Sequence, residues 1–196
     1  MFSDHIQLTK GKVSRGLGIL YKAKWLLKQK TLLTLYHSFI YPYFTYCISV
    51  WGNTYKTHLS RLIKLQKRAI RLLCREKWDA PSQPLFKKLN LLTIQELYLY
   101  SVQIFNYKFM HKILPETFWN FFTYNCDIHN YNTRQSHHFH SRLSKTKQIS
   151  KNIRTTGISI NNHFMKYVSH NCTLTTYKKH IKSYILSNDL TFLIES

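Results

Sequence analysis

Acidic side chains are scarce in this chain, and their scarcity limits the chemistry it can perform. The 196 residues include only 8 Asp and Glu, and no two aspartates are adjacent. Two-metal phosphoryl transfer needs clustered carboxylates that hold two cations about 4 Å apart. Only Glu76 and Asp79 are near neighbours, and we expect them to compensate the charge of the basic segment before them. We therefore expect no polymerase or nuclease activity from this chain alone.

Glycine and proline are also few, with 5 and 4 residues respectively. A sandwich or barrel of short strands needs more turn residues than this. The sequence also lacks a glycine-rich phosphate loop and a G-x-S-x-G nucleophile motif. These absences favour a mainly α fold and give no sign of a nucleotide-hydrolysing or esterase-like site.

The four cysteines lie far apart and form no C-x-x-C pair. This usage is typical of a reduced compartment, and the first residues contain no apolar signal segment, so we expect an intracellular protein, nuclear or cytoplasmic. A zinc site is an alternative use of one of them, since Cys126 and His129 are followed by His137, His138 and His140. Their spacing matches none of the usual structural zinc sites, so the sequence predicts no metal.

Charged residues are missing from residues 31–52, a run about as long as a membrane-spanning helix. Pro42, His37 and many hydroxyl side chains suit two buried helices better than one helix in lipid. Leu32, Leu35, Tyr36, Phe39 and Ile40 recur at helical spacing and predict a helix that Pro42 ends. A membrane span is the less favoured alternative.

Basic residues are abundant where acids are rare. The chain has 29 Lys and Arg, a formal net charge of +21 and a sequence pI near 9.9. Solubility needs only a modest net charge, and nucleic acid is the usual partner of so large an excess. An anionic membrane surface would attract the same charge, and it remains the competing partner.

The segment from Leu59 to Arg75 is predicted to form one helix with apolar and basic side chains on opposite faces. At about 100° per residue, one face carries mostly apolar side chains: Leu59, Leu62, Ile63, Gln66, Ala69, Ile70 and Leu73. The opposite face carries the basic stripe: Arg61, Lys64, Arg68, Arg71 and Arg75. Leu65 and Leu72 lie on the flank of that stripe. We predict that the basic stripe contacts phosphates, although a solvated helix face is the simpler alternative.

Two further helices can be read from the second half of the chain. Thr93 and Glu96 have the spacing of a capping box, which predicts a buried helix that continues to Phe109. Helical spacing resumes near the end of the chain in a terminal amphipathic helix: Leu174, Tyr177, Ile181, Tyr184 and Ile185. Lysines 178, 179 and 182 lie opposite that apolar face.

Residues 127–156 are polar, basic and poor in large aliphatic side chains. This composition predicts a surface loop, with a possible short β-hairpin around Gln148 to Ile160. The loop contains Tyr131 and Arg134, a ring and a guanidinium that suit contacts to a base or a phosphate. The same residues could instead fix the loop to its own domain.

An ordered series of motifs runs through most of the chain and resembles one protein family. The series comprises K-V-S at 12–14 with G-I-L at 18–20, S-F-I-x-P at 38–42, W-G-N-T at 51–54, L-Q-K-R-A-I-R at 65–71, L-P at 114–115 and Y-N-T-R-Q at 131–135. It is similar to the region C-terminal to the palm in reverse transcriptases of non-LTR retrotransposons, the jockey-like group of LINE elements. The similarity weakens after Gly157, where Asn161-Asn162 replaces the family's Trp-Asn pair.

The resemblance implies a thumb-like helical region over residues 1–78 and a helical C-terminal connector over residues 79–196. It implies an RNA-directed DNA polymerase as the parent protein, with Mg²⁺ held by a palm that these residues do not contain, so no cofactor is expected here. The implied partners are an RNA template or RNA/DNA hybrid and the palm and fingers of the parent. A basic structural protein at a membrane surface is the alternative from another class.

Overall fold

The computed structural model describes residues 2–129, 131, 133–141, 144, 146–168, 170–188, 190 and 192–195, which are mainly helical. The helices are α1 (Ser3–Ala23), α2 (Gln29–Phe39), α3 (Tyr41–Thr45), α4 (Ile48–Trp51), α5 (Lys56–Cys74), α6 (Ser82–Lys88), α7 (Ile94–Met110), α8 (Lys147–Ser150), α9 (Ile153–Phe164), α10 (Leu174–Ser187) and α11 (Phe192–Glu195), with 3₁₀ turns η1 (Glu116–Phe118) and η2 (Asn125–Asp127). The mainly α fold class is therefore confirmed.

The chain forms two compact units, residues 1–97 and residues 98–196. The division falls inside α7, between Leu97 and Tyr98. These compact units are defined by packing alone. The division at residue 78 between a thumb-like region and a connector, which the resemblance implies, is a functional division and stays a prediction.

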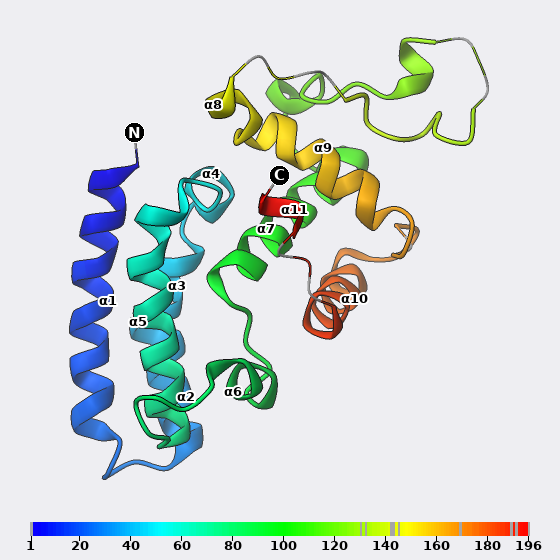
Figure 1. Ribbon diagram of the computed structural model, residues 1–196. Coiled ribbons are helices and arrows are strands. Elements are labelled where there is room, and N and C mark those ends of the chain that lie inside the picture. The colour runs from blue at the N-terminus through cyan, green and yellow to red at the C-terminus, as the bar shows by residue number, and fades with distance from the viewer. Residues whose placement is uncertain are drawn as a thin grey trace. The chain divides into compact units, whose positions relative to one another are not determined.

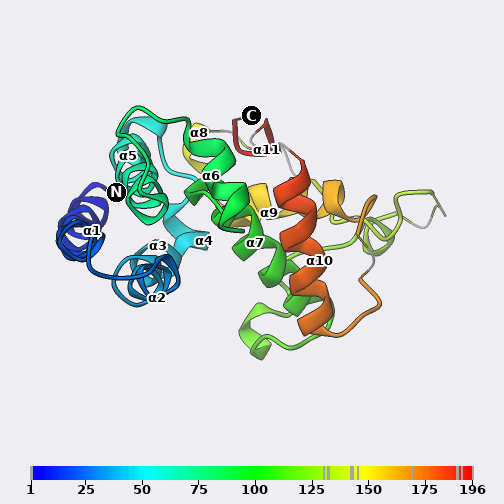
Figure 2. The ribbon, with the colours of Figure 1, turned by 90° about the horizontal axis from the view of Figure 1, so that it is seen from below.

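Helices α1, α2 and α5 form the core of the first unit (Figure 1). Seen nearly end-on, they occupy the corners of a triangle (Figure 2). Helix α2 returns antiparallel to α1, whereas α5 runs in the same direction as α1, so the C-terminal ends of α1 and α5 lie together. The parallel pairing of α1 with α5 determines which side chains of the two helices meet.

The predicted apolar face of α5 is the face that packs. Its buried residues are Leu59, Leu62, Gln66, Ala69, Ile70 and Leu73, while Ile63 is half-buried. Helix α2 ends at Phe39, and Pro42 lies in the first turn of α3, as expected for a residue that lacks a backbone donor. Both predictions made from helical spacing are therefore confirmed.

The capping box is also present. The backbone amide of Thr93 donates to the Glu96 carboxylate at 2.7 Å, and the Glu96 amide donates to the Thr93 hydroxyl at 3.3 Å. Helix α7 follows at Ile94, and α10 occupies the position predicted for the terminal helix.

The second unit contains the rest of α7 together with α8 to α11. Helix α7 is joined to α9 by the Tyr98 and Thr156 hydroxyls, 2.6 Å apart, and to α10 by Gln103, whose amide donates to the Tyr177 hydroxyl at 2.8 Å. Phenylalanines pack on one another beside these helices: the Phe122 and Phe139 rings are stacked with centroids 4.6 Å apart. Many aromatic side chains of this unit therefore form part of its own core.

The β-hairpin expected around Gln148 to Ile160 is wrong. Residues 147–150 and 153–164 form α8 and α9, and Thr146 and Asn152 cap them by accepting from the amides of Ile149 and Arg154. The polar loop thus ends earlier than its composition suggested. Among the described residues the β pairing is an isolated antiparallel bridge between Tyr124 and Phe139.

The uncharged run at 31–52 is divided among α2, α3 and α4. In the described part of the chain, no helix combines the length and the apolar character needed to cross a bilayer.

Candidate functional site

The exposed face of α5 carries the cations that the sequence placed there. Arg61, Lys64 and Arg68 are exposed, and Arg71 is half-buried. From Arg61 to Arg71 the helix advances about 15 Å along its axis. Helix α5 contains no acidic residue, so these charges have no partner within their own helix.

Three residues of the basic stripe line a groove between α5 and the end of α1. The groove has a volume of about 460 Å³, and the helices supply Tyr21 and Leu72 as well as cations. Its basic lining residues are Lys24, Lys64, Arg68 and Arg71. Glu76 lines it too and partly offsets their positive potential. A second hollow along the same seam shares Tyr21, Arg68 and Leu72 with it.

Parallel packing of α1 and α5 explains how this groove forms. Ser14, Leu17 and Gly18 of α1 lie beside Leu65 and Arg68 of α5. Further along, Tyr21 meets Leu72, because both helices advance in the same direction at the same rise per residue. The C-terminal turn of α1 therefore brings Tyr21 and Lys24 to the C-terminal half of the basic stripe.

Arg71 and Arg75 also hold the two segments that border the groove. The Nε of Arg71 donates to the Ala80 carbonyl at 2.7 Å, which fixes the loop after α5. The Nη2 of Arg75 donates to the Leu27 carbonyl at 2.8 Å, which ties the connection between α1 and α2 to the end of α5. These two arginines thus combine their predicted role at phosphates with a role in local structure.

Arg75 does not continue the helix as the sequence suggested. It follows the last helical residue and adopts a left-handed conformation with φ of 57°. Its amide donates to the Leu72 carbonyl, and the Glu76 amide donates to the Arg71 carbonyl, the pattern of a Schellman C-cap. The chain reverses here and carries Trp78 back toward the groove.

Exposed aromatic rings surround the cations. Trp78 lines the groove and is 88% exposed, and Tyr21 is 55% exposed. The Lys24 ammonium lies 4.8 Å from the centroid of the Tyr21 ring and 4.5 Å from that of the exposed Trp25 ring. Such distances are typical of cation–π contacts. Cations and flat apolar surfaces are therefore interleaved at this end of the first unit.

Reasoning from the sequence missed Tyr21, Lys24 and Trp78 as parts of one site. The available signal was local: Y-K-A-K-W at 21–25 and E-K-W at 76–78 each combine lysine with an aromatic residue. Neither segment indicates that it meets the other, since that depends on the packing of α1 against α5.

The second predicted contact, Tyr131 and Arg134, lies in the second unit. Both side chains are exposed. Tyr131 lines a hollow of about 410 Å³ together with Thr133, His129 and His140, whereas Arg134 is not among its lining residues. Asn132 of the same motif lies outside the described residues. The structure does not test a role for Tyr131 and Arg134 in nucleic-acid binding, which stays a prediction.

The histidine-rich segment does not gather into a metal-binding geometry. The His129 and His140 rings are 6.4 Å apart between centroids, and the Nδ1 of His140 lies 3.2 Å from the Asn125 side-chain oxygen. The Sγ of Cys126 approaches Asp127 instead of a histidine. Over the described residues, no three His, Cys, Asp or Glu side chains lie close enough together to hold a metal ion.

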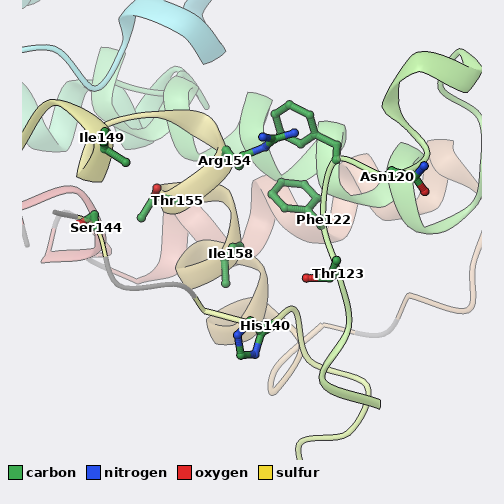
Figure 3. Close-up of a pocket in the computed structure, with 10 residues that line it drawn as sticks. Asn120, Phe122, Thr123, His140, Ser144, Ile149, Arg154, Thr155 and Ile158 are labelled. Atoms are coloured by element: carbon green, nitrogen blue, oxygen red, sulfur yellow. The ribbon is translucent and has the colours of Figure 1, made fainter. Parts of the chain in front are cut away.

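A further pocket of about 290 Å³ lies in the second unit between residues 120–123 and α9 (Figure 3). Phe122 and Ile158 form its apolar wall, and Thr123, His140 and Thr155 add polar groups. Arg154 stacks its guanidinium on the Phe121 ring, 4.8 Å from the centroid. This pocket includes none of the residues predicted to bind nucleic acid.

Comparison with known proteins relates the chain to reverse transcriptases. It is 29% identical, over 101 residues, to a probable RNA-directed DNA polymerase from transposon BS of Drosophila melanogaster. The match covers 48% of this chain and 11% of the fly protein, so the chain spans only a small part of that relative's length. No known family profile matches the chain, and no solved structure matches it. The similarity supports a relationship with a transposon reverse transcriptase.

Proposed function

We propose that this chain is a nucleic-acid-binding fragment of the reverse transcriptase of a non-LTR retrotransposon, of the jockey-like LINE group. It would correspond to the thumb and C-terminal connector and lack the catalytic palm. Its partners would be an RNA template or RNA/DNA hybrid, together with the palm and fingers of the parent polymerase. The similarity to the fly transposon polymerase supports this origin, and the order of motifs along the chain supports the assignment to the region after the palm.

The groove beside α5 is the observation that carries the binding role. It concentrates Lys24, Lys64, Arg68 and Arg71 against a single carboxylate, in a chain of net charge +21. Phosphates are the anions that such rows of Lys and Arg side chains recognise without reading sequence. We expect the chain to hold the nucleic-acid backbone while the palm of the parent performs the chemistry.

The role of the basic stripe can be tested by the salt dependence of binding. Arg61, Lys64 and Arg68 are the best residues to change, because all three are exposed and none of them has a partner among the described residues that a substitution would break. Each phosphate contact contributes about 0.7 to 0.9 to the slope of log K against log salt concentration. Changing the three to Gln should flatten the slope by about two to three units and leave α5 folded, because Gln is a good helix former.

A matched control removes three positive charges elsewhere. Lys166, Lys178 and Lys179 are exposed residues of the second unit. Changing them to Gln should flatten the slope less than the α5 variant does. Equal effects of the two variants would mean that binding is diffuse attraction to a basic chain, and the basic stripe would have no special role.

A further inference from the structure

The groove contains more than phosphate ligands. Trp78 and Tyr21 place exposed rings among its cations, and Trp25 extends this aromatic surface through its contact with Lys24. Trp51 and Tyr36 of the same unit are buried, so these exposed rings are not part of its core. These rings stay in solvent beside Lys24, Arg68 and Arg71. Such a combination of flat rings and cations suits a ligand that is both planar and anionic.

We propose that this groove binds single-stranded nucleic acid and that Trp78 and Tyr21 stack on its unpaired bases. The inference rests on the proposed function, because it takes the basic stripe as the phosphate contact and adds a second type of contact to it. Bases in the interior of a duplex are already stacked on one another and cannot reach a ring on the protein surface. Base stacking on aromatic side chains is the usual means by which proteins hold a single strand without reading its sequence.

The arrangement of the cations and the rings suits simultaneous contacts to phosphates and to a base. The stripe from Arg61 to Arg71 follows the axis of α5, whereas the rings gather at the C-terminal end of that helix. A strand whose phosphates follow the stripe would therefore bring a base to Tyr21 and Trp78 at one end. Arg71 donates a hydrogen bond to the Ala80 carbonyl and so fixes the backbone of the loop that carries Trp78.

An anionic lipid surface is the other ligand that combines charge with affinity for tryptophan. The packing of α5 argues against it. A helix that lies on a membrane presents its apolar face to lipid, but the apolar face of α5 is buried in the core of the unit through Leu62, Ala69 and Ile70. The face left outside is basic, with only half-buried leucines on its flank.

The test compares a labelled oligo(dT) of about 12 nucleotides, a length within the usual range for such sites, with a blunt duplex of the same length. Fluorescence anisotropy at one salt concentration gives both dissociation constants. We expect Trp78→Ala to weaken single-strand binding by at least about fivefold, the lower end of what one base stack contributes. Its duplex affinity should stay within about twofold of the starting protein, since every base of a blunt duplex except those of the two terminal pairs is stacked on both faces.

Three further variants make the result specific. Trp78→Phe keeps an aromatic ring and should retain most of the single-strand affinity, whereas Tyr21→Ala should lose part of it. Tyr46→Ala is the matched control, because Tyr46 is an exposed ring of the same unit that does not line the groove. This control should change neither affinity.

The binding results that would contradict the inference differ from one another. If Trp78→Ala and Tyr21→Ala both bind oligo(dT) as the starting protein does, or lose single-strand and duplex affinity equally, the stacking inference is wrong. The α5 variant with three glutamines then decides whether phosphate binding itself survives. If Trp78→Ala weakens binding to phosphatidylcholine vesicles that contain phosphatidylserine, and leaves oligo(dT) binding unchanged, the groove is a lipid contact and the inference is overturned.

Discussion

Gln66 is a polar residue in the middle of the apolar face of α5, and its side chain links two parts of the first unit. It is almost completely buried at 1% exposure. Its amide nitrogen donates to the Leu92 carbonyl at 2.9 Å, and its amide oxygen accepts from the Ile94 amide at 2.9 Å. Gln66 therefore satisfies both backbone groups at the point where the chain enters α7, and an apolar residue there could satisfy neither.

We predict that Gln66→Leu lowers the free energy of unfolding by about 2 to 4 kcal/mol. The change leaves one buried donor and one buried acceptor without partners, and each such group costs about 1 to 3 kcal/mol. Urea denaturation followed by circular dichroism measures the effect. Lys67→Leu, at the next and exposed position of α5, is the control and should change stability by less than about 0.5 kcal/mol. A Gln66→Leu protein as stable as the starting protein would contradict the proposed link.

Among the helices, α1 contains two glycines that differ in how closely other residues approach them. A Cβ atom at Gly16 would lie 2.7 Å from the Cγ1 of Ile40 and 2.9 Å from the carbonyl oxygen of Phe39. Helix α1 thus needs a glycine where it approaches the end of α2. At Gly11, by contrast, a Cβ atom would meet nothing within 4 Å.

Alanine substitutions at these two glycines should therefore have opposite signs. We predict that Gly16→Ala destabilises the protein by about 1 to 3 kcal/mol, since the Phe39 backbone cannot move aside as a flexible side chain could. Gly11→Ala should stabilise it by about 0.4 to 1 kcal/mol through helix propensity and a less flexible unfolded chain. Thermal unfolding of the two variants provides the comparison. Stabilisation by both would mean that α1 and α2 do not approach each other at Gly16.

The incorrect prediction of a β-hairpin over residues 148–160 also concerns an element of secondary structure. The segment contains β-branched residues such as Ile153, Thr155 and Ile158, which favour strands when considered alone. Tertiary contacts outweigh that preference. Thr156 bonds to Tyr98, and the Gly157 carbonyl accepts from Asn106, so the segment is held against α7 as a helix. Asn152 at its start supplies the N-cap.

For the molecule as a whole, three histidines of the second unit connect stability to pH. Burial lowers the pKa of His138, His163 and His170 below the ordinary value of 6.5. Lys166 lowers the pKa of the first two further, and His111 that of the third. The Nε2 atoms of His163 and His170 are buried without a hydrogen-bond partner, so both rings fit their sites as neutral groups.

The sign of the pH effect follows from these directions. Below about pH 6.5 the unfolded chain binds protons at these histidines more readily than the folded chain does. Stability should therefore be full above pH 6.5 and fall as the pH drops from there toward the lowered pKa values. We predict a lower urea midpoint at pH 5.5 than at pH 7.5. His170→Gln should reduce that difference, whereas the control His180→Gln, at an exposed position of α10, should not. An equal difference in both variants would exclude a role for His170.

The sequence alone determined the features that depend on local spacing. Helical periodicity identified α2, α5 and α10 and the buried face of α5, because a side chain's face on a helix follows from its position along the chain. The capping box marked the start of α7 for the same reason, since its two hydrogen bonds join residues three apart. The basic stripe of α5 was visible too, although its contact with phosphates stays a prediction.

Which side chains lie beside the basic stripe depends on the tertiary structure. Tyr21 and Lys24 join Arg68 and Trp78 because α1 and α5 pack in parallel, and this packing depends on contacts between residues about 50 positions apart. No local pattern records such a pairing. The left-handed cap at Arg75 and the hydrogen bond from Arg71 to Ala80 then direct Trp78 to the groove. The sequence could predict a row of charges, but the aromatic rings beside it were brought there by packing between distant segments.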